Sequence, residues 1–194
     1  MAQKRQKISA EIILATALDR AEIDGWQNTS LHDLADDLGI TLSVIKDHYC
    51  DLDAIANAWF QRSLKAMLAP TELGFCDLPP RERLFQIIMC WLDAMATHKN
   101  LTMQMIRVKL YLGHPHHWAP LIFNLSRLVH WIREAAFLHA QGRQRQLEEV
   151  GLTCLVVKIF RFWGNDQSED QIQTRQFLSE QLEVCDRIML RLCR

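Results

Sequence analysis

The polar side chains of residues 28–55 are the best candidates for binding chemistry in this sequence. Hydroxyl, ammonium and imidazole groups can hydrogen-bond phosphate oxygens and base edges, which are the contacts that DNA-binding proteins make. We expect the following side chains to face DNA: Thr29, Ser30, Thr41, Ser43, Lys46 and His48. The same stretch holds six acidic residues and a single basic one, so DNA binding here would depend on local contacts.

Helix signals in the same stretch arrange these side chains. Thr29 or Ser30 can cap a helix start, because a side-chain oxygen there accepts a backbone N–H that has no partner within the helix. Apolar residues then recur at helical spacing up to Gly39, which suits a left-handed helix end, and Thr41 can cap a second short helix. Two short helices joined by a glycine-containing turn predict a helix-turn-helix, which presents its second helix to a major groove.

Soft, adaptable side chains farther along the chain could line an apolar ligand pocket. The candidates are Met89, Met103, Phe123, Trp131 and Phe160. Side chains of this kind at helical spacing also suit an ordinary hydrophobic core, and both interpretations stay open at this stage. The pocket interpretation predicts an unknown small apolar ligand and no cofactor.

Three histidines could ligate a metal ion: His114, His116 and His117, in the sequence GHPHHW. Pro115 makes this segment a loop, and no carboxylate or thiolate partner is implied, so histidines at a helix start are the simpler interpretation. The six cysteines are scattered without metal-binding or framework spacing, which predicts reduced thiols and no metal site. No nucleophile–base pairing, phosphate loop or pair of acids at catalytic spacing occurs, so we expect no enzymatic activity.

The elements that must position these residues are helices. Apolar residues recur at helical spacing along the chain, and no convincing alternating strand pattern occurs, which predicts an all-α fold. We expect nine helices, at about residues 9–24, 30–38, 41–49, 51–69, 80–98, 100–112, 117–140, 145–163 and 168–192. The first three would form a head domain, residues 1–50, and the other six a body domain, residues 51–194.

Length and composition agree with a folded protein. The chain has 194 residues, of which 49% are hydrophobic and 23% charged, so it can bury a sizeable core. Its formal net charge of −1 does not by itself indicate a nucleic-acid partner. No run of about 18 apolar residues occurs, and the start, MAQKRQKISAEII, lacks the apolar core of a secretory signal. We therefore expect a cytoplasmic protein without membrane insertion.

Several residues of the head, taken together, resemble the TetR family of bacterial transcriptional regulators. They are Ala15, Ala17, Leu18, Gly25, Trp26, Thr29, Ser30, Leu31, Leu34, Ala35, Leu38, Gly39, Ile40, Thr41, His48, Tyr49 and Ile55. With the nine-helix layout, the resemblance covers essentially the whole chain. Two positions depart from the family pattern: Lys46 stands where members usually carry a tyrosine, and Leu52 where they usually carry a lysine.

This resemblance implies a TetR-like architecture and a ligand-responsive regulator that binds operator DNA as a homodimer. In that family the body binds a small ligand, and the last two helices pair two subunits. Residues 145–194 would then supply the dimer contact here. A ligand in the body would tilt the fourth helix and change the spacing of the two heads, so ligand binding and DNA binding would be coupled.

A second resemblance concerns the stretch Trp163–Asp170 with Thr174, Phe177 and Leu178. It is similar to the last part of the lipid-binding accessory proteins of ubiquinone biosynthesis, which have a TetR-like body. The alternative function is therefore a TetR-shaped protein that binds a lipid or quinone intermediate and no DNA. A simpler interpretation is that Asp166 or Ser168 caps the ninth helix.

Overall fold

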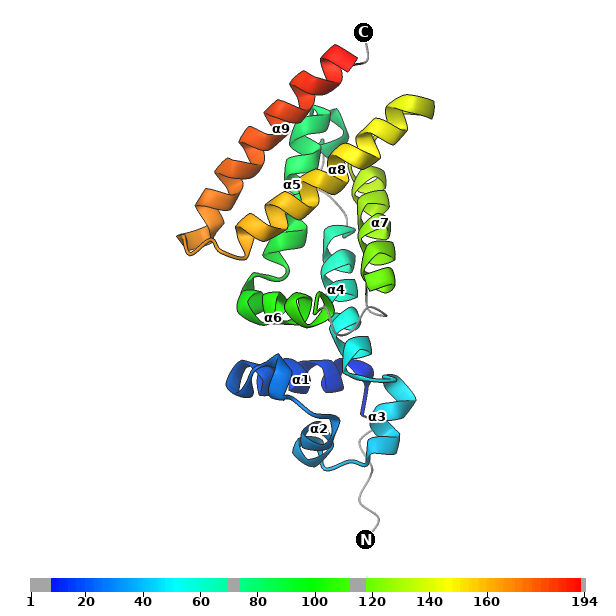
Figure 1. The fold of residues 1–194 in the computed structure, drawn as a ribbon, viewed down its shortest axis with the longest axis vertical. Helices are drawn as coiled ribbons and strands as arrows, with labels where there is room; N and C mark the ends of the chain where they lie inside the picture. The colour runs from blue at the N-terminus through cyan, green and yellow to red at the C-terminus, as the bar shows by residue number, and fades with distance from the viewer. Residues whose placement is uncertain (1–7, 70–73, 112–117, 193–194) are drawn as a thin grey trace. The chain divides into compact units, whose positions relative to one another are not determined.

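The structure is a computed structural model that describes residues 8–69, 74–111 and 118–192 (Figure 1). Those residues form nine α-helices and a few short 3-10 helices, with no strand, which confirms the predicted all-α, nine-helix architecture. The α-helices are α1 (Ala10–Asp24), α2 (Leu31–Leu38), α3 (Leu42–His48), α4 (Leu52–Met67), α5 (Pro80–Asp93), α6 (Lys99–Lys109), α7 (Trp118–Ala135), α8 (Gly142–Trp163) and α9 (Ile172–Leu192).

The chain divides into two compact units. The head unit comprises Met1–Arg62 and His98–Val108, and the body unit comprises Ser63–Thr97 and Lys109–Arg194. The head unit thus takes in α6 as well as the first three helices, whereas the predicted head domain follows the chain and ends at residue 50. Helix α4 begins in the head unit and ends in the body unit.

Capping residues explain where the helices of the head unit begin and end. The Ser9 and Ser30 hydroxyls accept the Ile12 and Asp33 amides at 3.3 and 3.1 Å, and Asp51 Oδ1 accepts the Ala54 amide at 2.7 Å. Gly39 ends α2 in the left-handed conformation, with φ of 61°. Such a backbone is easy for glycine because it has no Cβ.

Helix α6 is tied to the rest of the head unit by hydrogen bonds across long sequence separations. The buried Trp59 indole N–H donates to Thr102 Oγ1 at 2.9 Å, and the Trp26 amide donates to Gln104 Oε1 at 2.9 Å. His98 Nδ1 lies 2.7 Å from Glu22 Oε1, which joins α1 to the start of α6. Side chains of a helix that lies later in the chain therefore complete the head unit.

The body unit has its own apolar core. Helices α5, α8 and α9 contribute Ile88, Leu92, Ile159, Trp163 and Leu178, all of which are fully buried. Two of its helices end earlier than the sequence predicted. Helix α5 ends at Asp93, before a 3-10 turn at Ala96–His98, and α7 ends at Ala135 because Phe137 adopts a left-handed backbone with φ of 52°.

The turn between α8 and α9 is held by one buried carboxylate. Asp166 Oδ1 accepts the Ser168 amide at 2.8 Å, and Asp166 Oδ2 accepts the Thr174 amide and hydroxyl at 2.9 and 2.6 Å. Burial of the carboxyl opposes its ionisation, but the hydrogen bonds from Ser168 and Thr174 together outweigh burial and lower the pKa of Asp166 to about 2. The helix-capping interpretation of this stretch is thereby confirmed.

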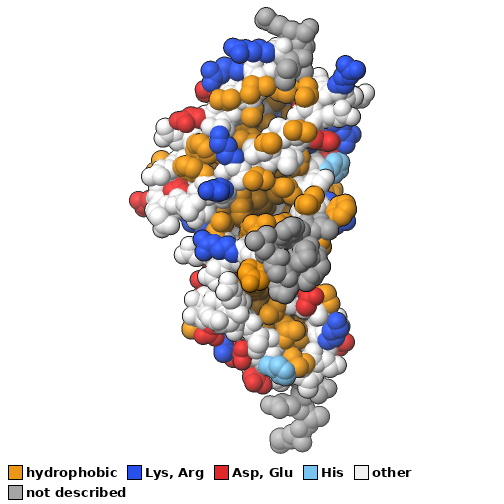
Figure 2. Space-filling model, viewed as in Figure 1, with side chains coloured by type: hydrophobic (Ala, Val, Ile, Leu, Met, Phe, Trp, Pro, Cys, Tyr) orange, Lys and Arg blue, Asp and Glu red, His pale blue; other side chains and the backbone are white. Residues whose placement is uncertain are grey.

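Charge is divided unevenly along the chain. Residues 8–55 hold ten acidic residues and two basic ones, a formal net of −8, whereas residues 56–194 hold thirteen acidic and seventeen basic residues, a net of +4. Figure 2 shows acidic side chains gathered over α1 and α2 and blue Lys and Arg side chains spread over the body unit. The helices expected to approach DNA are therefore the more acidic part of the chain.

Two further predictions concern membrane insertion and metal binding, and each can be compared only with the described residues. None of the described helices combines the length and the apolar character that crossing a membrane requires. No group of three potential metal ligands occurs among the described residues, and the candidate metal ligands His114, His116 and His117 lie outside them.

Candidate nucleic-acid interface

Helix α3 presents one buried face and one solvent face. Ile45 is fully buried, whereas Ser43, Lys46 and His48 are exposed. Thr41 occupies the N-cap position, is exposed, and makes no capping hydrogen bond through its hydroxyl. The structure therefore places four of the six predicted DNA-facing side chains on the exposed surface of α3 and at its start.

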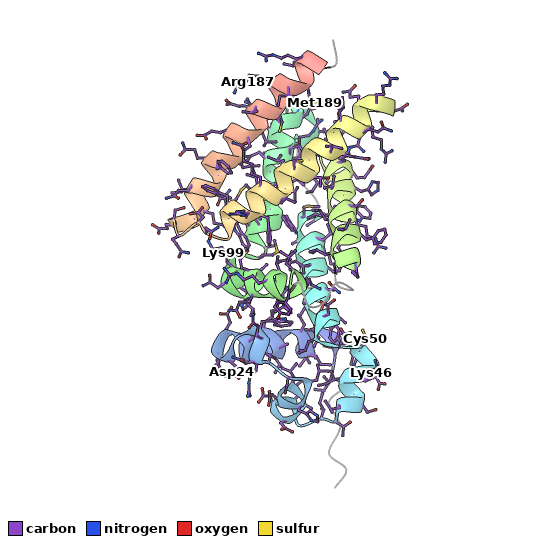
Figure 3. The ribbon with its side chains drawn as sticks, in the orientation of Figure 1. Asp24, Lys46, Cys50, Lys99, Arg187 and Met189 are labelled. Atoms are coloured by element: carbon purple, nitrogen blue, oxygen red, sulfur yellow. The ribbon has the colours of Figure 1, made fainter. Side chains whose placement is uncertain are left out.

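Lys46 lies near the carboxyl end of α3. Its ammonium donates to the Cys50 carbonyl oxygen at 3.3 Å, and Figure 3 labels the two residues close together at this end of the helix. A cation is favourable there, because the last carbonyl groups of a helix carry partial negative charge. The Lys46 side chain is otherwise exposed to solvent.

Of the remaining two predicted residues, Thr29 closes the Trp26–Asn28 turn and Ser30 caps the start of α2. Thr29 is only 5% exposed, and its hydroxyl donates to the Gly25 carbonyl at 3.1 Å. The half-buried Ser30 hydroxyl donates to Asp33 Oδ2 at 2.6 Å, and this hydrogen bond lowers the pKa of Asp33. Thr29 therefore does not belong to the exposed surface. Its burial follows from how the Trp26–Asn28 turn packs, which the sequence alone did not reveal.

Tyr49 was not among the predicted site residues, yet it positions α3. Its hydroxyl donates to the Ala10 carbonyl at 2.9 Å, so the end of α3 is fastened to the start of α1. Partial burial, together with the nearby Glu11 carboxylate, raises the pKa of Tyr49 and keeps it a donor. In the sequence, this role could have been inferred only from the position of Tyr49, an aromatic residue directly after α3.

The cations near this surface are few. Among residues 8–55, Arg20 is held by Asp24 at 2.6 Å and by Asp37 at 3.0 Å. Lys46 is then the other basic residue of that range. The surface offers hydroxyl donors and one lysine on an acidic background, which suits close hydrogen bonding more than long-range attraction of DNA.

Comparison with known structures decides the family. The chain is 38% identical to a TetR transcriptional regulator from Nitrosomonas europaea ATCC 19718, with a TM-score of 0.80 over 91% of this chain and 97% of that one. The protein belongs to the TetR family of transcriptional regulators. The resemblance noted in the head residues is thereby confirmed over 91% of the chain.

More distant comparisons add only the fold. The TetR family regulator PfmR from Thermus thermophilus is 17% identical, with a TM-score of 0.53 over 88% of this chain and 97% of that one. No family model matches this TetR regulator, and no curated protein matches it. The comparisons do not support the resemblance to ubiquinone-biosynthesis accessory proteins, and the Asp166 network accounts for that stretch as a helix turn.

The structure scatters the five predicted ligand-binding residues. Met103 belongs to the head unit, whereas the other four lie in the body unit. Phe123 and Trp131 are exposed on α7, and Phe160 packs against Trp91 with ring centroids 5.6 Å apart. Met89 is the one of the five that lines a groove of the body unit formed by α4, α5 and α9.

That groove has a volume of about 490 Å³ and a mainly apolar wall. It lies between the end of α4, the outer side of α5 and the start of α9, and its lining residues are Ala66, Phe85, Gln86, Met89, Cys90, Asp93, Ala94 and Arg175. One end is polar, because Arg175 Nη2 donates to both Asp93 carboxylate oxygens at 3.0 and 2.8 Å. The groove is thus an open surface depression with an apolar wall and one polar end.

Proposed function

We propose that this TetR regulator binds operator DNA as a homodimer and releases it in response to a small apolar ligand. The observation that carries the proposal is the 38% identity to a TetR transcriptional regulator over nearly the whole of both chains. The exposed face of α3 supports the DNA-binding part. Acting on operator DNA would place the protein in the cytoplasm, and no catalytic role is proposed.

For DNA binding, the proposed contacts are Ser30, Thr41, Ser43, Lys46 and His48. Two heads would lie in successive major grooves about one helical turn apart and bind a pseudo-palindrome. Lys4, Arg5 and Lys7 precede α1 in the sequence and would add phosphate contacts. These cations matter because residues 8–55 supply so few.

The proposed dimer contact is the exposed apolar face of α8 and α9. Leu147, Val150 and Val157 recur three and seven residues apart along α8, and Val184 and Ile188 lie four apart on α9, all with exposed side chains. Two copies of such a face can bury each other around a two-fold axis as a four-helix contact. Burial of these side chains would supply most of the binding free energy.

The proposed ligand site is the groove beside Met89. Helix α4 contributes Ala66 to this groove and also runs into the head unit, so a shift of α4 on ligand binding would reach the DNA-binding helices. Ligand and DNA would then each weaken the binding of the other by the same factor. The other predicted ligand-binding residues, Met103, Phe123, Trp131 and Phe160, do not line this groove and are not part of the proposed site.

The DNA-binding proposal is tested by fluorescence anisotropy on DNA that flanks the gene, across a series of salt concentrations. Lys46→Ala should weaken binding about tenfold at low salt, and Lys65→Ala, which removes an exposed lysine of the body unit, should leave it unchanged. Equal effects of the two variants, or no sequence preference by the wild type, would contradict the proposal.

The ligand proposal is tested with N-phenyl-1-naphthylamine, an apolar dye that fluoresces when bound. Ala66→Trp fills the groove and should weaken dye binding about tenfold or more, while Ala69→Trp, an exposed position outside the lining, should bind the dye normally. Dye binding that both variants retain would place the ligand elsewhere.

The alternative function, a lipid or quinone-intermediate binding protein without DNA binding, is favoured by one observation. The net of −8 over residues 8–55 opposes approach to a polyanion. Native mass spectrometry of the purified protein separates the two functions: a co-purified lipid, together with no specific DNA binding in the anisotropy experiment, would favour the alternative.

A further inference from the structure

A row of facing side chains joins α8 to α9 along their exposed side. Phe162 stacks on Phe177 with ring centroids 4.2 Å apart. Four residues earlier in α8 and four later in α9, the Lys158 ammonium donates to Gln181 Oε1 at 2.7 Å. The two helices therefore run antiparallel in a constant register, and residues four apart on each helix lie on the same side.

The next pair in this register consists of two cysteines. Continuing the register of the Phe162–Phe177 and Lys158–Gln181 pairs by one turn along both helices brings Cys154 of α8 opposite Cys185 of α9. Cys154 is exposed and Cys185 is half-buried, and both are free thiols. The apolar contacts between α8 and α9 are made by other residues, such as Leu155 and Leu182, which are buried in the core.

The pKa of Cys185 gives a second indication that Cys154, Cys185 and Lys158 are close neighbours. Burial is the largest effect and leaves the pKa of the Cys185 thiol raised, a charge on Cys154 adds to this rise, and the Lys158 ammonium acts against it. Such effects fall off with distance and are appreciable only between neighbouring groups. The thiols of Cys154 and Cys185 thus share one site, where the Lys158 ammonium partly offsets the effect of burial on the Cys185 thiol.

We propose that Cys154 and Cys185 form a dithiol site, which hydrogen peroxide oxidises to a disulfide that joins α8 to α9. The Cys154 thiolate, which is the more exposed, attacks the peroxide: a sulfur–oxygen bond forms, the O–O bond breaks, and the departing hydroxide takes up a proton as water. The Cys185 thiolate then attacks the sulfenic sulfur, the S–S bond forms, and the oxygen leaves as a second water. Two thiols are oxidised while one peroxide is reduced to two waters.

The site belongs to a single chain, so it does not depend on the proposed dimer. It does adjoin the proposed dimer face, because Val150 and Val157 flank Cys154 on the exposed side of α8. A disulfide would fix the separation of α8 and α9 at this level. Oxidation would in this way act on the pair of helices that carries the dimer contact.

The test treats the full-length protein with one equivalent of hydrogen peroxide, blocks the remaining thiols with N-ethylmaleimide, and maps unreduced peptides by mass spectrometry. We expect a linked Cys154–Cys185 peptide and a fall in free thiols from six to four. Cys154→Ser and Cys185→Ser should each abolish the linked peptide, whereas Cys90→Ser, which removes an exposed thiol of α5, should retain it. Circular dichroism verifies that the serine variants are folded.

Three outcomes would overturn the proposal. The first is a band at twice the chain mass on a non-reducing gel that Cys154→Ser removes, because Cys154 would then bond to a second subunit. The second is over-oxidised Cys154 beside a free Cys185 thiol. The third is a rate of disulfide formation that Lys158→Gln leaves unchanged, because removal of the neighbouring ammonium should slow the reaction several-fold.

Discussion

The helix-turn-helix face and the α8–α9 face differ in the forces that can act on them. Residues 8–55 carry a net charge of −8 and present hydroxyl groups with a single exposed lysine, Lys46. The outer side of α8 and α9 instead exposes aliphatic side chains such as Val157 and Ile188. The first surface would bind through placed hydrogen bonds and a few cations, and the second through burial of apolar area.

The contrast between the acidic helix-turn-helix face and the apolar α8–α9 face indicates how the proposed DNA binding would be achieved. Each acidic head can gain little from long-range attraction, so specific contacts, the terminal cations and the pairing of two heads must supply the affinity. Pairing through an apolar face depends weakly on salt, whereas phosphate contacts depend on it strongly. Dimerisation and DNA binding should therefore respond differently to salt, charge reversal and truncation.

The largest effect is expected from breaking the apolar face. Val157→Glu places a carboxylate where a side chain that is 50% exposed would become buried between subunits, and an unpaired buried charge is strongly unfavourable. Sedimentation should show a monomer, and DNA affinity should fall at least about 100-fold, because two heads would no longer bind together. Ile122→Glu, at an exposed isoleucine of α7, is the control and should stay dimeric. A dimeric Val157→Glu variant would locate the subunit contact elsewhere.

Next in size is removal of the terminal cations. Replacing Lys4, Arg5 and Lys7 with glutamine removes six charges from a dimer, so the slope of log affinity against log salt should fall by up to about 5. Anisotropy titrations at several salt concentrations measure this slope. Lys65→Gln with Arg127→Gln, two exposed cations of the body unit, should leave it unaltered. An unchanged slope in the triple variant would mean that these cations do not touch DNA.

A smaller effect concerns the turn that joins the two helices of the apolar face. Asp166→Asn removes the charge that Ser168 and Thr174 stabilise and should lower the free energy of unfolding by about 2 kcal/mol at neutral pH. Because the pKa of Asp166 is lower in the folded state, its contribution is full above about pH 4 and is lost as pH falls toward 2.

Urea unfolding of the wild type and the variant at several pH values measures this contribution. The two stabilities should converge in acid, since the wild-type carboxylate is protonated there. Asp170→Asn is the matched control, because Asp170 is an exposed acid in the same turn and asparagine tolerates its left-handed backbone. A difference between wild type and Asp166→Asn that stays constant with pH would rule out the charge as its cause.

The smallest expected effect is a gain in DNA affinity. Asp47 is exposed beside Lys46 on α3, so Asp47→Asn should tighten DNA binding by roughly two- to fivefold at low salt through reduced repulsion. Asp19→Asn removes an exposed acid of α1 and should change affinity less. Anisotropy at matched salt compares them. Weaker binding by Asp47→Asn would indicate that this carboxylate contacts a base.

The contrast between the two faces was only partly predictable from sequence. The cap at Thr29 or Ser30 and the helix end at Gly39 were predictable because a cap involves residues within about four positions of one another. Thr29 was expected at the DNA-facing surface, but its hydroxyl is buried against Gly25. The end of α7 was placed too late, since nothing local in the sequence marks Phe137 as left-handed.

By itself, the sequence determined the all-α class, the helix-turn-helix and the acidic charge of the head, because amphipathic spacing and capping act between near neighbours along the chain. Only the tertiary structure decided that α6 completes the head unit through Trp59 and Thr102, and that α8 and α9 pair in the register that brings Cys154 toward Cys185. Such contacts join residues 31 to 43 positions apart, and they depend on how whole helices pack. Helical periodicity specifies which side of a helix is apolar, but it leaves open which other helix will cover that side.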